Sequence, residues 1–158
     1  DVIRYAIMDQ IGGLYLDLDY EMLKPFDLSG GAILPKSRDS AFGDKDDRIG
    51  NCILASEKGH TFWKDVLKDL TDHPFQIGEE ELDVEKATGP YLLTRIFYNG
   101  TWDNIQTPKR QLFHPPSPRK EKDYNLILEE DVAYGIHHAH GSWRQPQWKK
   151  FLSRILGK

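Results

Sequence analysis

Apolar residues recur at helical spacing in several stretches of the chain, and each such stretch predicts a helix. The first stretch covers residues 1–11, where the apolar positions are Ile3, Ile7, Met8 and Ile11. Similar amphipathic patterns predict further helices over residues 61–70, 90–98 and 145–156. A pair of glycines directly after the first stretch, Gly12-Gly13, is expected to end that helix.

Short apolar runs between the predicted helices are typical of strands, because glycine, proline or polar residues bound them. These runs cover residues 14–18, 32–34, 51–55, 105–106 and 133–138. The polar, acidic or proline-rich segments in between predict loops at residues 36–50, 76–88 and 108–125. Because strands alternate with helices along the chain, the expected fold class is α/β.

The composition is that of one globular domain, since 158 residues with 39% hydrophobic and 29% charged side chains suffice for a core. A formal net charge of −4 argues against nucleic acid as the main partner. No apolar run approaches the roughly 18 residues that a transmembrane helix needs. The chain lacks a starting methionine and opens inside a helical pattern, so we expect an upstream segment to be missing.

Two carboxylates, Asp17 and Asp19, end the apolar run at residues 14–18. Residues two apart on a strand share a face, so both side chains are predicted to project together. Two carboxylates in that position repel each other unless a cation lies between them, and oxygen ligands suit Mg²⁺ or Mn²⁺. The alternative is a strand end that turns into solvent and carries acidic residues without a ligand.

Residues 136–143 hold three histidines and end in Trp143. Neighbouring residues of a strand face opposite sides, so one of His137 and His138 points into a given site. An imidazole there would contact a metal ion or a phosphate, unless the segment is only a histidine-rich surface turn. Trp143 offers a flat face to a sugar or a base, or packs into the core beside Trp148.

The single cysteine, Cys52, has no neighbouring base and is interpreted as a small buried side chain. Two other metal chemistries are disfavoured. Zinc is not expected, because partner cysteines are lacking and the histidine spacing is not typical of zinc sites. A metal-dependent phosphohydrolase also clusters aspartate and histidine, but usually needs more ligands than this chain offers around one strand.

Three further positions are candidates for ligand contacts. Asp1 and Arg4 share one face of the first helix, either as an exposed pair or reaching a phosphate or sugar hydroxyl. Gly89 precedes the helix at residues 90–98, whose first backbone N–H groups either bind a ligand oxygen or simply begin the helix. Asn51 flanks a predicted strand and would line a cleft there.

The order of these segments resembles that of glycosyltransferases with an aspartate-x-aspartate (DXD) sugar-binding motif. The similarity is to yeast initiating α-1,6-mannosyltransferases, inositol-phosphoceramide mannosyltransferases and bacterial capsular polysaccharide transferases, and more distantly to glucosylating clostridial toxins. The motifs that carry it are residues 1–5, Gly12-Gly-Leu-Tyr-Leu-Asp-Leu-Asp19, residues 51–60, Ala87-Thr-Gly-Pro90 and residues 136–143.

The resemblance implies a GT-A fold, a Rossmann-like mixed sheet flanked by helices that binds a nucleotide sugar. Residues 1–158 would be the C-terminal portion of one such domain, without its first nucleotide-binding β/α units. It also implies retaining, Mn²⁺- or Mg²⁺-dependent transfer of a hexose from a UDP-hexose or GDP-mannose to a glycan or glycolipid hydroxyl. The alternative is a non-catalytic carbohydrate- or nucleotide-binding domain derived from such a transferase.

The resemblance also implies roles for single residues. Asp19 would be a metal ligand and Asp17 would contact the ribose or sugar of the donor, and both would act in catalysis with Arg4. His137 would complete the metal or phosphate contact, with His138 as the second choice. The remaining expected donor contacts are Asp1, Tyr15, Asn51, Gly89, Ser142 and Trp143. An enzyme of this kind would act in the cytoplasm, free or associated with a membrane, or in the Golgi lumen of a eukaryote.

Overall fold

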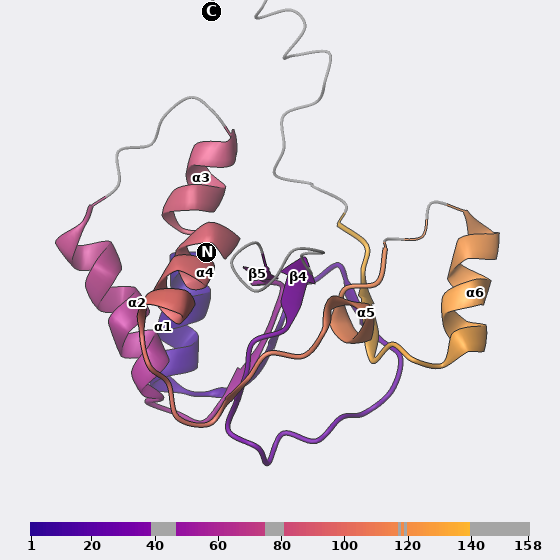
Figure 1. The fold of residues 1–158 in the computed structure, drawn as a ribbon, viewed down its shortest axis with the longest axis horizontal. Helices are drawn as coiled ribbons and strands as arrows, with labels where there is room; N and C mark the ends of the chain where they lie inside the picture. Colours follow the sequence, from indigo (N-terminus) through magenta and orange to yellow (C-terminus); the bar gives the residue numbers. More distant parts are fainter. Residues whose placement is uncertain (39–46, 75–80, 117, 119, 140–158) are drawn as a thin grey trace, which may run out of the picture.

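The computed structural model describes residues 1–38, 47–74, 81–116, 118 and 120–139. Helices and strands follow one another along these residues, as the hydrophobic pattern predicts (Figure 1). The elements are α1 (Val2–Gln10), β1 (Gly13–Leu16), β2 (Tyr20–Met22), β3 (Ala32–Ile33), β4 (Lys36–Arg38), β5 (Arg48–Ile49), β6 (Ile53–Ser56), α2 (Thr61–Asp72), α3 (Glu81–Ala87), α4 (Pro90–Asn99), β7 (Ile105–Gln106), α5 (Arg110–Phe113), α6 (Glu121–Glu130) and β8 (Gly135–His137).

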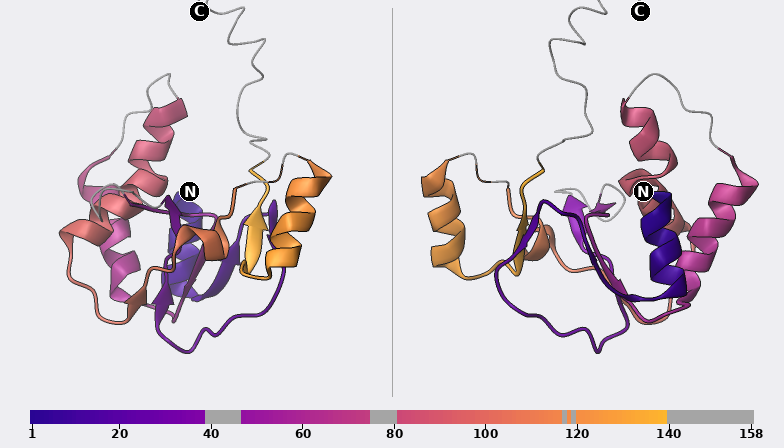
Figure 2. Two further views of the ribbon diagram at one scale, coloured as in Figure 1. Left: turned by 45° about the vertical axis from the view of Figure 1, so that its right-hand side comes forward. Right: turned by 180° about the vertical axis from the view of Figure 1, so that it is seen from behind.

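The central element is a four-stranded mixed sheet with the strand order β1-β6-β3-β7. β6 runs antiparallel to both β1 and β3, and β7 lies parallel to β3. Two smaller antiparallel pairs, β2–β8 and β4–β5, accompany this sheet. Helices flank it, with α2 and α6 at opposite ends of the molecule (Figures 1 and 2). The α/β class predicted from the sequence is therefore confirmed.

Two apolar clusters lie on opposite sides of β6, because successive strand residues face opposite ways. Leu54 belongs to the larger cluster, which α1, α2 and α4 cover, and Ile53 belongs to the smaller one beside β2 and α5. In the larger cluster Trp63 stacks on Tyr5 and donates a hydrogen bond from Nε1 to Ser56 Oγ at 2.6 Å. These two contacts hold α2 against both α1 and the sheet.

The buried face of α1 is rotated from the predicted one and shares only Met8 with it. Ile3 and Ile11 are 76% and 71% exposed, whereas Tyr5 and Met8 are fully buried. Both sets have helical spacing, so periodicity alone could not select between them. The Tyr5 hydroxyl also donates to the Thr88 carbonyl at 2.7 Å, a contact that an aliphatic side chain cannot make.

Gly12 ends α1 as expected. Its φ of +71° is a left-handed conformation, and its N–H donates to the Met8 carbonyl at 3.1 Å. A Cβ atom at this position would lie 2.4 Å from the backbone nitrogen of Lys58. Only glycine therefore lets the chain turn so closely beside the segment between β6 and α2.

Some predicted loops contain regular structure. β4 and β5 lie within residues 36–50, α3 lies within 76–88, and α5 and the start of α6 lie within 108–125. The acidic and proline-rich composition of these segments favours loops, so the sequence did not predict helices α3, α5 and α6. α6 buries none of its described side chains and therefore shows little apolar periodicity. The helix predicted over residues 145–156 lies outside the described residues. None of the described helices is both long and apolar enough to cross a membrane.

Candidate functional site

The Asp17-x-Asp19 segment forms a tight turn and not the end of a strand. β1 ends at Leu16, so the strand predicted over residues 14–18 is two residues too long. The Asp17 N–H donates to the Cys52 carbonyl at 2.8 Å, and the Tyr20 N–H donates to the Asp17 carbonyl at 3.0 Å. The two carboxylates are neighbours because of this turn, while Leu18 at its tip is fully exposed.

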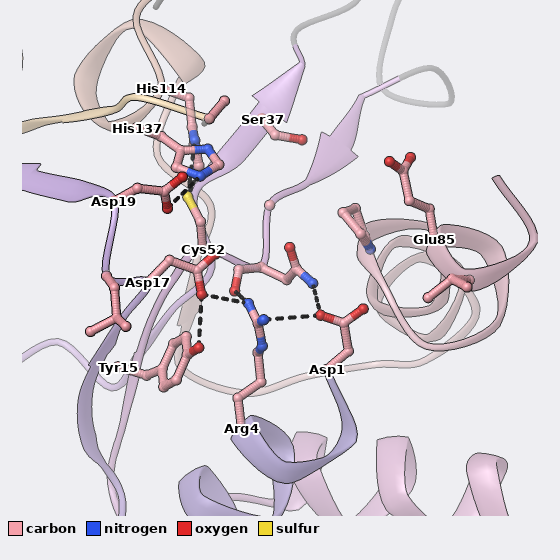
Figure 3. A pocket seen from close by; sticks show the side chains of 16 residues that line it. Asp1, Arg4, Tyr15, Asp17, Asp19, Ser37, Cys52, Glu85, His114 and His137 are labelled. Carbon is pink, nitrogen blue, oxygen red and sulfur yellow. Dashed lines mark hydrogen bonds and ion pairs between the residues drawn. The ribbon is translucent and has the colours of Figure 1, made fainter. Parts of the chain in front are cut away.

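His137 reaches this turn through the pairing of β8 with β2. Tyr20 lies opposite His137 in the register, and the His138 N–H extends the ladder to the Asp19 carbonyl at 2.9 Å. His137 Nε2 consequently lies 3.3 Å from Asp19 Oδ1 (Figure 3). One ligand atom each from Asp17, Asp19 and His137 falls within 4.8 Å of the other two.

His138 lies on the other face of the strand. Its Nε2 is 2.9 Å from Glu21 Oε2, and the Tyr124 hydroxyl donates to Glu21 Oε1 at 2.6 Å. The hydrogen bond from Tyr124, followed by that from His138, lowers the pKa of the Glu21 carboxyl. The structure therefore brings His137, and not His138, to Asp17 and Asp19.

Arg4 connects α1 to the turn. Its guanidinium lies 3.0 Å from Asp1 Oδ1 and 2.9 Å from Asp17 Oδ1, and it donates to the Asn51 carbonyl at 2.6 Å. The same group lies 4.9 Å from the centroid of the Tyr15 ring, in a cation–π contact. A planar fork with several donors is required for this set of partners, so lysine could not replace it.

Asp1 and Asp17 are each held by further donors. The Tyr15 hydroxyl donates to Asp17 Oδ1 at 2.7 Å, and Asn51 Nδ2 donates to Asp1 Oδ1 at 3.0 Å. Burial, and then the bond to Asp17, raises the pKa of Tyr15 to about 12, so this phenol remains a donor at neutral pH. One connected group thus contains five residues that are expected to contact the nucleotide sugar, namely Asp1, Arg4, Tyr15, Asp17 and Asn51.

Other expected contacts are placed differently. Gly89 caps the start of α4, but its own N–H donates to the Glu85 carbonyl at 3.1 Å. A Cβ atom at Gly89 would also lie 2.9 Å from Glu85 backbone atoms, so the tight turn between α3 and α4 explains this glycine. Ser142 and Trp143 lie outside the described residues.

A cleft of about 870 Å³ joins these groups, a volume within the usual range for small-molecule sites. Its charged lining is mainly acidic, since Asp1, Asp17, Asp19 and Glu85 face it together with Arg4. Figure 3 shows Arg4 between Asp1 and Asp17, with His137 and Asp19 at the other end. The lining therefore suits a cation, or an anion that arrives with one.

This cleft is also lined by Cys52 and His114, which the sequence does not assign to a site. Cys52 Sγ lies 3.5 Å from His114 Nδ1, although 62 residues separate them in the chain. Burial lowers the pKa of His114 to about 3, with smaller contributions from His137 and Arg110. Burial likewise raises the pKa of the Cys52 thiol. No local pattern marks His114, because only the fold brings the turn after α5 to the start of β6.

Part of this site lies in a segment that matches a known protein family. Residues 1–39, which contain Arg4, Asp17 and Asp19, match a family model described as the glycosyltransferase sugar-binding region containing a DXD motif. The chain is also 32% identical over 116 residues to inositol phosphoceramide mannosyltransferase 3 of Schizosaccharomyces pombe.

Together these similarities support a DXD glycosyltransferase of the type that includes inositol-phosphoceramide mannosyltransferases. The aligned region covers 72% of this chain and 30% of the fission yeast protein. The chain therefore spans only about a third of the length of that relative. The similarity therefore concerns one region of the relative, and residues 1–39 of this chain contain the DXD motif.

Proposed function

We propose that this chain supplies the metal- and sugar-binding part of a GT-A glycosyltransferase. The enzyme would move a hexose from a nucleotide-diphosphate sugar, a UDP-hexose or GDP-mannose, to a hydroxyl group of a glycan or glycolipid, with retention. The observation that carries the proposal is the convergence of Asp17, Asp19 and His137 within 4.8 Å in a cleft that Arg4 also lines. The similarity to DXD glycosyltransferases supports glycosyl transfer in general.

The donor atoms of this group fit Mn²⁺ or Mg²⁺. Carboxylate oxygens suit both ions, and an imidazole nitrogen favours Mn²⁺. The acidic lining would repel a diphosphate that arrived alone, and a divalent cation removes that repulsion. Asp17, Asp19 and His137 would hold the ion, which when bound would stabilise charge on the leaving nucleotide diphosphate.

The other residues would orient the donor sugar. Arg4 is fixed by Asp1, Asp17 and the Asn51 carbonyl, so its remaining N–H groups have a defined direction toward a sugar hydroxyl or a phosphate oxygen. Because Tyr15 and Arg4 both bind Asp17 Oδ1, that carboxylate is oriented before a donor enters. Such preorganisation lowers the entropy that must be lost when the substrate binds.

Donor hydrolysis by the full-length protein tests the proposal. The assay supplies Mn²⁺ with UDP- and GDP-hexoses, and compares Asp19→Asn with Asp27→Asn, whose carboxylate binds Ser29 outside the cleft. We expect Asp19→Asn to lower the rate by about a hundredfold or more, as for loss of a main electrostatic group. Unchanged hydrolysis in Asp19→Asn would reject the metal role of this carboxylate.

Calorimetry separates a transferase from a binding domain that has lost catalysis. A transferase should bind Mn²⁺ and a nucleoside diphosphate together far more tightly than either alone, and should also turn over the sugar nucleotide. Binding of both ligands without hydrolysis or transfer, under any of the donors tested, would instead support the non-catalytic alternative.

A further inference from the structure

One end of the cleft carries donor atoms of a different kind. A ligand atom from each of Cys52, His114 and His137 lies within 4.8 Å of the other two. Cys52 and His114 are only 3% and 7% exposed, so these two side chains lie deeper than the carboxylates. Figure 3 shows the sulfur and the two imidazoles gathered beside Asp19, away from Asp1 and Arg4.

The fold fixes each of the three side chains from a separate element. Cys52 directly precedes β6, and its carbonyl accepts the Asp17 N–H at 2.8 Å. His114 is the C-cap residue of α5, and its backbone N–H donates to the Arg110 carbonyl at 2.6 Å. His137 ends β8. The three positions are therefore set by backbone hydrogen bonds and not by mobile side chains alone.

Gly50 provides the space in which the His114 imidazole lies. A Cβ atom at residue 50 would be 2.6 Å from His114 Nε2 and 3.0 Å from its Cε1. A larger residue would push the ring out of its place, so the chain keeps a backbone position clear for this imidazole. The ring also lies edge-on to His137, with the centroids 6.3 Å apart.

We propose that Cys52, His114 and His137 form a second metal site, selective for Zn²⁺ and similar thiolate-binding ions. One sulfur and two imidazole nitrogens suit Zn²⁺, whereas Mn²⁺ and Mg²⁺ prefer oxygen. Metal–ligand bonds of about 2.0–2.3 Å put neighbouring ligands of a tetrahedral ion about 3.5 Å apart, so a small contraction completes the site. The thiol proton passes to solvent as the sulfur binds, and water takes the fourth position.

The second site has a consequence for the first, which rests on the proposed function. His137 belongs to both groups, and two divalent cations in adjoining sites repel each other. Zinc bound at Cys52 would therefore oppose manganese bound at Asp17 and Asp19. The expected result is inhibition of donor hydrolysis by zinc that added manganese relieves.

Cobalt titration of the full-length protein tests the site without any sugar donor. Co²⁺ replaces Zn²⁺ and gives a thiolate-to-cobalt charge-transfer band when a cysteine is a ligand. We expect this band in the wild-type protein, its displacement by Zn²⁺ and its loss in Cys52→Ser. His114→Asn should weaken binding by about tenfold or more, whereas His73→Asn, an exposed imidazole outside the cleft, should not. Cobalt binding whose spectrum is the same in Cys52→Ser overturns the proposal.

A second measurement avoids the variants altogether. Alkylation of Cys52 in the native protein, followed by mass spectrometry of its peptide, should slow at least several-fold when Zn²⁺ is added. An alkylation rate that zinc does not change overturns the site, even if Cys52→Ser fails to fold.

The activity arm separates the two proposals. Hydrolysis by each protein is expressed relative to its own rate without zinc. The zinc concentration that halves this relative rate should be at least tenfold higher for Cys52→Ser than for the wild-type protein. A normal cobalt spectrum without Mn²⁺-dependent hydrolysis would reject only the proposed function. Hydrolysis without the cobalt band would reject only the second metal site.

Discussion

His137 Nε2 lies 3.3 Å from Asp19 Oδ1, although the two residues come from opposite ends of the described chain. The antiparallel pairing of β8 with β2 produces this contact, because its register sets Tyr20 against His137. A shift of the register by one residue would present His138 to Asp19 instead. The composition of the proposed Mn²⁺ site therefore depends on strand pairing as much as on the DXD turn.

Replacing the two neighbouring histidines separately tests this register. His137→Asn should weaken Mn²⁺ binding by about tenfold or more, because it removes the nitrogen nearest Asp19. His138→Asn, whose imidazole contacts Glu21, should change Mn²⁺ affinity much less. Isothermal titration with Mn²⁺ and a nucleoside diphosphate measures both. Equal losses in the two variants would contradict the assignment of His137 alone.

Arg4→Lys should lower kcat/KM for donor hydrolysis by about tenfold or more. An ammonium group cannot contact Asp1, Asp17 and the Asn51 carbonyl together, and about 1.4 kcal/mol of lost transition-state stabilisation is a factor of ten. The matched control is Arg95→Lys, which replaces an arginine bound to Asp69 outside the cleft. Steady-state kinetics with comparable activity for both variants would argue against the positioning role of Arg4.

Alanine at Gly12 should destabilise the protein more than alanine at Gly59. Their φ values are +71° and +72°, so both variants bear a left-handed strain of about 1–2 kcal/mol. Only at Gly12 would the new Cβ also meet backbone, 2.4 Å from the Lys58 nitrogen, for a total of about 2–5 kcal/mol. Thermal unfolding compares the two. The same change in Tm in both would show that close packing at Gly12 is unimportant.

Asp69→Asn should reduce stability at neutral pH and have little effect in acid. Arg95 binds the carboxylate through two hydrogen bonds and is the main cause of its lowered pKa. Because the folded-state pKa is lowered, the stabilisation is present above the unfolded value of about 3.9 and is lost as pH falls through the folded value. We expect about 0.5–1 kcal/mol, since Arg95 is half exposed. Urea unfolding at pH 7 and at successively lower pH should show a difference between Asp69→Asn and the wild-type protein that shrinks as the pH falls.

Local pattern was sufficient for much of the fold. α2 and α4 were predicted because their apolar residues repeat at helical spacing, and Pro90 suits the first turn of α4. Strand β6 was predicted from a continuous apolar run, which is buried on both faces. For α1 the sequence predicts the burial of Met8 correctly but not that of Tyr5, because Tyr5 and Ile3 belong to overlapping helical repeats and the choice depends on what packs against them.

For the site, the sequence by itself determined the residue types and their order: Asp17 and Asp19 after a glycine pair, Arg4 before them and a histidine pair after them. Such local signals suffice because a motif needs only near neighbours in the chain. The tertiary structure alone decided that the carboxylates meet in a turn and that His137 joins them.

The tertiary structure confirms that Cys52 is a small buried side chain and adds neighbours that the sequence did not predict. In the sequence it is a lone cysteine without partners, and in the fold its sulfur lies beside His114 with His137 in the same group. The physical reason is the same in both cases. Spacing along one strand or helix determines which residues share a face, whereas contacts between distant segments depend on strand register and on clearances such as that at Gly50.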